Sequence, residues 1–218
     1  MFHIRASVGF VCALTAVFAS PAFGAFAHGE GWDNSTLAGW DSSSNLADVS
    51  VMPAGGTPQG YVECCSAIST VVGVQTPSDD WTGNLAAAGI TGVTVDLKFQ
   101  LGNYTDARLR FRYQDSFSNG WTLPLTTDLA ANNTWQHCSV SFDPTWTDTQ
   151  AIAAGWFQET CTPSFAETMA DVYTSEVRLT GSDVLIAGVD NFTLVPEPAS
   201  IGLLALSGLA MLRRRNAA

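Results

Sequence analysis

The segment Ile90-Thr-Gly-Val-Thr-Val-Asp-Leu-Lys-Phe-Gln-Leu101 carries the clearest structural signal in the chain. From Val93 onward, every second residue is apolar, and the residues between them are Thr, Asp, Lys and Gln. Because successive side chains of a strand point to opposite faces, this alternation predicts a β-strand with one buried face. The pattern returns over Arg108–Tyr113, and we expect a turn at Gly102-Asn103 between the two strands.

Similar patterns predict further short strands along the chain. They cover residues 48–52, 61–65, 68–74, 121–125, 134–142, 172–180 and 184–195, and the last two are expected to join through Gly181-Ser182. Two short helices are predicted at 148–156 and 164–170, the second from the capping-box spacing of Ser164 and Glu167. About eight strands with one or two short helices predict a mainly β fold, a jelly-roll-like β-sandwich.

The charge of the chain restricts its partners. Residues 28–198 contain five basic and all 20 acidic residues, which leaves a formal charge near −15. Such a surface repels polyanions, so nucleic acid and anionic lipid are poor partners. The sandwich body, placed at 28–194, is long enough to bury one core.

Both ends of the chain predict export. Residues 1–27 have the basic start, apolar stretch and small-residue end of a secretory signal peptide. Near the other end, Pro196, Glu197 and Pro198 precede the uncharged run 199–212, which Arg213, Arg214 and Arg215 close. As a helix this run spans about 21 Å, less than the roughly 30 Å hydrocarbon core of a bilayer. We therefore expect a short transmembrane helix that acts as a temporary stop, with the arginines on the cytoplasmic side.

The tail, residues 195–218, resembles the PEP-CTERM sorting signal of Gram-negative bacteria in all three of its parts. The resemblance implies processing by an exosortase-type enzyme at the inner membrane, followed by delivery to the cell surface or the exopolysaccharide matrix. It implies how the protein is handled, and it assigns no activity to the body.

Four cysteines remain after the predicted signal peptide: Cys64, Cys65, Cys138 and Cys161. An even count in an exported chain suggests disulfides, and four cysteines allow three pairings. We expect Cys138–Cys161 if a single bond forms, because its loop is local. The alternative pairs Cys64 and Cys65 with Cys138 and Cys161.

The sequence favours binding over catalysis. It contains no Gly-x-Ser-x-Gly elbow, phosphate loop or Cys-x-x-Cys, and nothing singles out a catalytic pair among its acids. We therefore predict no enzyme activity and no required cofactor. The body contains all seven tryptophans, whose rings either stack on sugars or fill the core. Trp121 and Trp146 are the candidate ligand-binding residues, since polar neighbours surround both.

A structural calcium ion is a second possibility. The stretch Gly188–Leu194 resembles the last strand of jelly-roll carbohydrate-binding modules, in which an aspartate and an acid of the first strand often hold calcium. The resemblance implies Asp190 as a ligand, together with Glu30 or Asp33. From about Trp81 to Leu194 the order of features also resembles the laminin B module, which implies a jelly-roll body and an extracellular adhesive role.

The sequence thus predicts an exported, non-enzymatic protein of the surface or exopolysaccharide matrix, with a body that binds polysaccharide. One alternative is a secreted hydrolase of extracellular polysaccharide. The other is a structural matrix protein without a ligand site.

Overall fold

The computed structural model describes residues 29–114, 119–160 and 162–197. The predicted signal peptide, the run 199–212 and the three terminal arginines lie outside these ranges. Within them, no helix combines the length and the apolar composition that crossing a bilayer requires.

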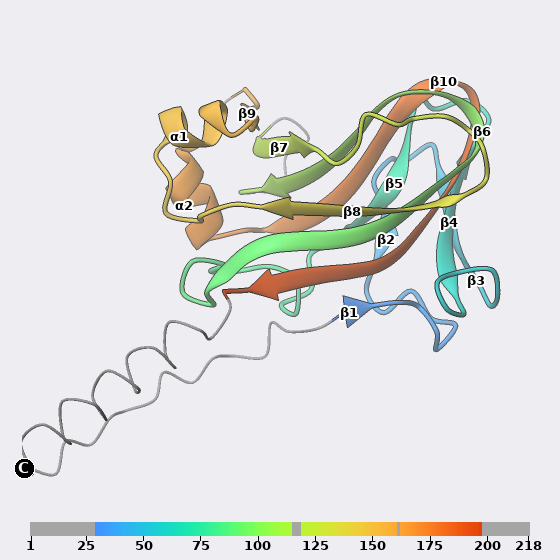
Figure 1. The fold of residues 1–218 in the computed structure, drawn as a ribbon, viewed down its shortest axis with the longest axis horizontal. Coiled ribbons are helices and arrows are strands. Elements are labelled where there is room, and N and C mark those ends of the chain that lie inside the picture. Colours follow the sequence, from blue (N-terminus) through green and yellow to red (C-terminus); the bar gives the residue numbers. More distant parts are fainter. Residues whose placement is uncertain (1–28, 115–118, 161, 198–218) are drawn as a thin grey trace, which may run out of the picture.

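The protein is a mainly β structure with two short helices (Figure 1). The strands are β1 (Gly29–Glu30), β2 (Asp41–Ser42), β3 (Asp48–Met52), β4 (Tyr61–Ser66), β5 (Val71–Thr76), β6 (Ile90–Arg112), β7 (Gly120–Pro124), β8 (Trp135–Ser141), β9 (Phe157–Gln158) and β10 (Thr174–Pro196). The helices are α1 (Asp148–Ala153) and α2 (Phe165–Ala170). The predicted mainly β sandwich is confirmed, and so is the capping box of Ser164 and Glu167.

Two 23-residue strands, β6 and β10, pair antiparallel and form the centre of the sheet. The predicted turns at Gly102-Asn103 and Gly181-Ser182 are wrong, because both strands continue through these positions. They bend there instead, and irregularities of register accompany the bend. Gly102 has φ 118°, which only glycine adopts readily. The glycines that suggested turns therefore curve one continuous pair of strands.

The bend divides the sheet into two layers, which Figure 1 shows lying one over the other. Layer 1 contains β8, the first half of β6, the second half of β10, β4, β3 and β1. Layer 2 contains β9, β7, the second half of β6, the first half of β10, β5 and β2. Side chains of both layers, such as Leu97 and Leu109, belong to one buried core. The alternate side chains point to the outer faces of the layers.

The bend generates a stability prediction. A Cβ on Gly102 would lie 2.6 Å from Leu185 Cδ2 and 2.7 Å from the carbonyl oxygen of Val184. Gly102→Ala therefore adds a steric clash to the strain of its positive φ, and we expect a loss of about 2–4 kcal/mol in the free energy of unfolding. Urea denaturation provides the measurement.

Gly83→Ala is the matched control, since Gly83 also has a positive φ, 88°, but a Cβ at this position would meet no atom within 4 Å. It should cost clearly less than Gly102→Ala. Equal losses for the two variants would contradict the view that close packing at the bend requires glycine.

Candidate functional site

Most of the tryptophans serve the core. Five of the seven are buried: Trp32, Trp40, Trp81, Trp121 and Trp156. Trp121 has 0% exposure; its Nε1 donates to the carbonyl oxygen of Pro163 and its ring packs edge-on against Phe165. The structure therefore contradicts the exposure expected for Trp121. Trp146 is partly exposed and packs on Phe165 at a ring distance of 6.2 Å.

Trp135 is the other partly exposed tryptophan, and it lies on the outer face of layer 1. β8 buries Cys138 against the core, so Trp135 and His137, an odd number of residues away, point outward. Trp135 stands opposite Lys98 of β6, which stands opposite Gly188 of β10. The next residue in this row is Glu63 of β4. The sheet thus aligns an aromatic, a cationic and an acidic side chain across four strands.

Tyr61 completes what we call the Trp135 cluster, which consists of Trp135, Lys98, Tyr61, Glu63 and Gln100. Lys98 Nζ lies 4.0 Å from the centre of the Tyr61 ring and 4.6 Å from that of Trp135. The two rings meet edge to face at 5.4 Å. A Cβ on Gly188 would lie 2.9 Å from Trp135 Cη2 and 3.1 Å from Tyr61 Cδ2. Only glycine at this position lets both rings approach the sheet.

The polar groups of the Trp135 cluster form hydrogen bonds with one another, and some of their donors and acceptors remain unused. Glu63 Oε2 accepts hydrogen bonds from the Tyr61 hydroxyl at 3.3 Å and from Gln100 Nε2 at 3.2 Å. Lys98 Nζ donates to the carbonyl oxygen of Gly55 at 3.3 Å, which leaves further N–H donors. Among the described residues, no donor reaches Glu63 Oε1 or Gln100 Oε1. The site therefore offers free donors and acceptors beside aromatic rings.

Burial shifts the pKa of two of these groups, Lys98 and Tyr61. Desolvation lowers the pKa of Lys98, while the charges of Glu63 and Asp190 oppose that change. Desolvation also raises the pKa of Tyr61.

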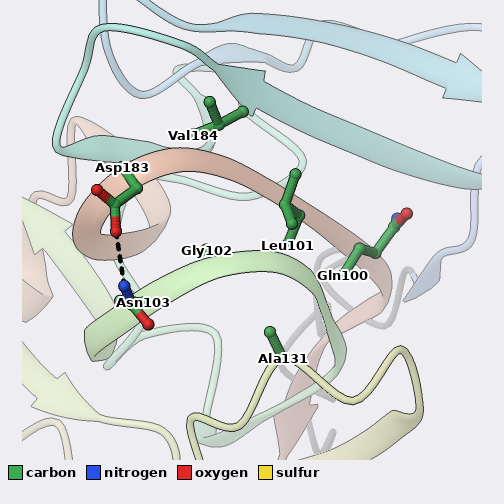
Figure 2. A pocket seen from close by; sticks show the side chains of 7 residues that line it. All are labelled: Gln100, Leu101, Gly102, Asn103, Ala131, Asp183 and Val184. Carbon is green, nitrogen blue, oxygen red and sulfur yellow. Dashed lines mark hydrogen bonds between the residues drawn. The ribbon is translucent and has the colours of Figure 1, made fainter.

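A pocket of about 470 Å³ lies next to the Trp135 cluster, at the bend of the two long strands. Figure 2 shows its lining: Gln100, Leu101, Gly102, Asn103, Ala131, Asp183 and Val184. Asn103 Nδ2 donates to Asp183 Oδ2 at 2.6 Å, and Leu101 and Val184 are half exposed. Gln100 belongs to both the pocket and the cluster, so the two form one continuous surface.

A group of acids borders the same outer face. Asp190 of β10 stands opposite Asp96 of β6, which stands opposite His137 of β8. His137 Nδ1 and Asp96 Oδ1 are 2.7 Å apart. A loop residue, Thr57, bridges the two acids: its N–H donates to Asp190 Oδ2 at 2.6 Å and its hydroxyl to Asp96 Oδ2 at 2.8 Å.

An irregularity in β10 brings Asn191 into the same group. Asn191 has φ 51°, and β10 holds one extra residue between its partners Asp96 and Thr94. The bulge turns Asn191 toward the outer face, where its Nδ2 donates to Asp96 Oδ2 at 2.8 Å and to the Thr57 carbonyl oxygen at 2.5 Å. Asp190 and Asn191, which are neighbours in β10, therefore both point to the outer face of layer 1.

The predicted calcium ligands come near one another around Gly31. A Cβ on Gly31 would lie 3.3 Å from Asn191 Oδ1 and 3.7 Å from both Asp190 Oδ1 and Asp33 Oδ2. Glu30 Oε1 accepts from the N–H of Trp32 at 2.8 Å. Desolvation is the main cause that raises the pKa of Asp190 and of Glu30, and nearby Asp96 and Asp33, respectively, raise them further.

The donor set fits a cation only in part. Within the described residues, no three or more His, Cys, Asp or Glu side chains are arranged to hold a metal ion. The oxygens around Gly31 are two carboxylates and one amide, a set of the kind that calcium accepts when backbone carbonyls or water supplement it.

The cysteines do not form the expected bonds. Cys64, Cys65 and Cys138 are free thiols, so the predicted Cys138–Cys161 bond is not present; Cys161 lies outside the described residues. Cys64 and Cys65 follow one another in β4 and therefore point to opposite faces. Cys138 points into the core of layer 1, where burial raises the pKa of its thiol to about 11.

The sorting triplet begins on the sheet itself. Pro196 is the last residue of β10 and pairs with Ile90, and the N–H of Glu197 donates to the carbonyl oxygen of Gly89 at 2.7 Å. Both residues are exposed. Pro198, Arg213, Arg214 and Arg215 lie outside the described residues.

Trp135 was the residue that the sequence-based choice of ligand-binding tryptophans missed. Its alternation with buried Cys138 was a usable signal, because an odd spacing on a strand means opposite faces. The polar neighbours of Trp121 were misleading, since β7 buries that ring between the layer and α2. No pattern in the sequence near Thr57 indicated that it contacts Asp96 and Asp190.

Different comparisons with known proteins apply to the C-terminal tail and to the β-sandwich body. Residues 194–216 match the PEP-CTERM protein-sorting motif. No curated protein sequence matches the chain.

Solved structures share the fold of the body at low sequence identity. The tandem CBM22-1–CBM22-2 domain of Paenibacillus barcinonensis Xyn10C has a TM-score of 0.53 at 7% identity, over 78% of this chain and 49% of that one. An exo-β-agarase has 0.51 at 11%, over 78% and 25%. The CBM22-1–GH10 modules of Clostridium thermocellum endo-1,4-β-D-xylanase 10B have 0.50 at 10%, over 79% and 28%. The chain spans half or less of each of these structures. The chain therefore combines a β-sandwich body with a PEP-CTERM protein-sorting motif.

Proposed function

We propose that this protein is an exported, non-enzymatic polysaccharide-binding protein of the cell surface or exopolysaccharide matrix. The Trp135 cluster carries the proposal, because it places a partly exposed indole beside free hydrogen-bond donors and acceptors at the edge of a pocket. Sugar rings present apolar faces together with many hydroxyl groups, and this combination matches them. The Clostridium thermocellum modules are complexed with xylohexaose, which agrees with a glycan ligand for this fold.

The chemistry of the Trp135 cluster favours binding over hydrolysis. Glycoside hydrolases of the common type use two carboxyl groups that flank the scissile bond. The cluster contains one, Glu63, and that carboxylate is tied to Tyr61 and Gln100. A hydrolase that acts on extracellular polysaccharide and a matrix protein without a ligand site are the competing functions, and a binding experiment separates all three.

We propose further that the tail directs the protein through the inner membrane. A signal peptide at 1–27 exports the chain, the helix 199–212 holds it with the C-terminus in the cytoplasm, and an exosortase-type enzyme acts at the triplet. The match of residues 194–216 to the sorting motif supports this route. The exposure of Pro196, the last residue of β10, and of Glu197 supports access by an enzyme.

A structural calcium ion at Asp190 is part of the proposal. Asp190, Asn191 and Asp33 supply the side-chain oxygens around Gly31, with Glu30 close by in β1. The raised pKa values of Asp190 and Glu30 mean that their ionisation destabilises the fold, which a bound cation would offset.

The ligand prediction concerns Trp135→Ala in the purified full-length protein. We expect the affinity for a neutral polysaccharide that the unchanged protein binds to fall about tenfold or more, because an aromatic platform usually dominates such an interface. Affinity electrophoresis in gels containing xylan, agarose or mixed-linkage glucan provides the measurement.

Trp146→Ala is the matched control, since Trp146 is also partly exposed but packs on Phe165, away from the Trp135 cluster. It should bind as the unchanged protein does. A loss of affinity confined to Trp146→Ala would place the binding site at Trp146 instead. If no polysaccharide retards the unchanged protein, the binding function is overturned. Release of reducing sugar from a polysaccharide would favour the hydrolase.

The calcium prediction follows from the direction of the pKa shifts. Because the folded-state pKa values of Asp190 and Glu30 are raised, the fold loses stability as pH rises through them. After bound metal has been removed with a chelator and the chelator exchanged away, we expect free calcium at a hundredfold excess over its Kd to raise Tm by roughly 5–10 °C at pH 8, with almost no effect at pH 4. Differential scanning calorimetry measures both.

Asp190→Asn should abolish the response to calcium, whereas Glu167→Gln, at the exposed start of α2, should retain it. An unchanged Tm on addition of calcium at pH 8 would exclude the metal site.

The sorting prediction concerns Arg213, Arg214 and Arg215. Replacing all three with alanine removes the charges that hold the end of the tail in the cytoplasm, so unprocessed protein should accumulate in the inner membrane. Membrane fractionation and immunoblotting in the native host give the result. Asp128→Asn, in an exposed loop, is the control. Normal surface delivery of the alanine variant would refute the proposed route.

A further inference from the structure

The outer face of layer 2 collects positive charge in an acidic protein. Four of the five basic residues between positions 29 and 197 point to this face: Arg108, Arg110 and Arg112 of β6 and Arg178 of β10. They occupy alternate positions, the parity opposite to that of buried Leu109 and Phe111. The fifth, Lys98, lies in layer 1 within the Trp135 cluster.

Arg110 belongs to the internal structure of this face. It is 1% exposed, its Nη2 lies 2.6 Å from Glu159 Oε2, and its Nη1 lies 2.7 Å from Glu176 Oε2. Arg112 is 2% exposed and its Nη1 donates to Gln75 Oε1 at 2.8 Å. Buried charges need such partners, and removing one would unfold the site rather than test it.

Arg178 and Arg108 differ from these two residues. They stand directly opposite each other on β10 and β6, at a separation where like charges repel. Both are partly exposed. Arg108 pairs with Asp106 and its Nη1 donates to the Thr122 hydroxyl at 3.0 Å. For the side chain of Arg178, the described residues provide no hydrogen bond and no ion pair.

The neighbours of the two arginines in this row supply no counter-charge. Gly73 of β5 stands beside Arg178, and Pro124 of β7 stands beside Arg108. Close by, Phe157 of β9 is 54% exposed, and the Cζ atom of Arg108 lies 5.0 Å from the centre of its ring. The row therefore combines two guanidinium groups, and an exposed aromatic ring lies beside it.

We propose that Arg178, Arg108 and Phe157 form a second binding site, which takes an acidic sugar unit of a polysaccharide. A carboxylate of the sugar accepts charge-assisted hydrogen bonds from the guanidinium groups, which relieves their mutual repulsion. Its ring packs on Phe157. The formal charge of the body, near −15, disfavours a dense polyanion such as nucleic acid, whereas the carboxylates of a uronic-acid polymer are more widely spaced.

This site lies on the layer opposite the Trp135 cluster, so its ligand is independent of the one proposed there. A protein with both sites would join an acidic and a neutral polysaccharide strand. If the binding test of one site fails, the proposal for the other site still stands, because the two sites are tested with different polymers.

The test uses affinity electrophoresis of the full-length protein in gels that contain polygalacturonate, dextran sulfate or dextran. We expect polygalacturonate to retard the protein, with an effect that weakens as salt rises, and dextran to leave its mobility unchanged. Arg178→Gln should weaken the affinity for polygalacturonate about tenfold, since it removes a charged hydrogen-bond donor. Phe157→Ala should weaken it as well.

Asn132→Asp is the charge-matched control. It changes the net charge by the same amount as Arg178→Gln, lies in an exposed loop, and keeps the oxygen that accepts from the N–H of Thr134. It should bind as the unchanged protein does, and thermal unfolding verifies that each variant is folded. Equal affinities of Arg178→Gln and Asn132→Asp would overturn the site, as would the absence of any retardation by polygalacturonate. Retardation by dextran sulfate alone would show that the carboxylate is not the recognised group and that the ligand is a sulfated sugar.

Discussion

The antiparallel pairing of β6 with β10 is the interaction on which the rest of the structure depends. Both strands are 23 residues long and remain paired from one end of the sandwich to the other. Every other strand of the sheet attaches, directly or through one neighbour, to one of these two. Because the pair bends near Gly102 and Gly181, it supplies the centre of both layers and aligns their inner faces around one core. A compact sandwich follows from a single curved ladder, without a separate interface between independent sheets.

The same ladder determines where chemistry can occur. Side chains of one parity fill the core, and those of the other parity form rows across the outer faces. In layer 1 the absence of a side chain at Gly188 lets Trp135 and Tyr61 meet over the sheet around Lys98. In layer 2 Gly73 stands beside Arg178 in the same row. Both candidate sites thus combine a row of outward side chains with a glycine in the same row, and each presents a different charge and a different aromatic ring.

The sorting motif is continuous with the fold. It begins at residue 194, and β10 ends at Pro196, so its first residues are paired with β6. Any enzyme that acts at the triplet meets the end of a hydrogen-bonded strand beside Gly89. Asp190 lies on this same strand, only a few residues before the motif, and β1 pairs with Phe192 and Thr193 between them. Stability of this corner of layer 1 and presentation of the tail are therefore properties of one strand.

The sequence by itself determined the class of fold, the parity of the strands, the capping box at Ser164 and the tail, because each rests on local spacing or local composition. It also contained the outward position of Trp135, through its odd distance from Cys138. It did not determine whether the glycines at 102 and 181 make turns or bends, since glycine permits both and only the pairing of β6 with β10 selects the bend. Nor did it show that Trp121 is buried, that Cys138 is an isolated thiol, or that Thr57 reaches Asp190, 133 residues away. Alternation states which side chains share a face; what covers that face, and which distant strand lies beside it, is decided only when the chain folds.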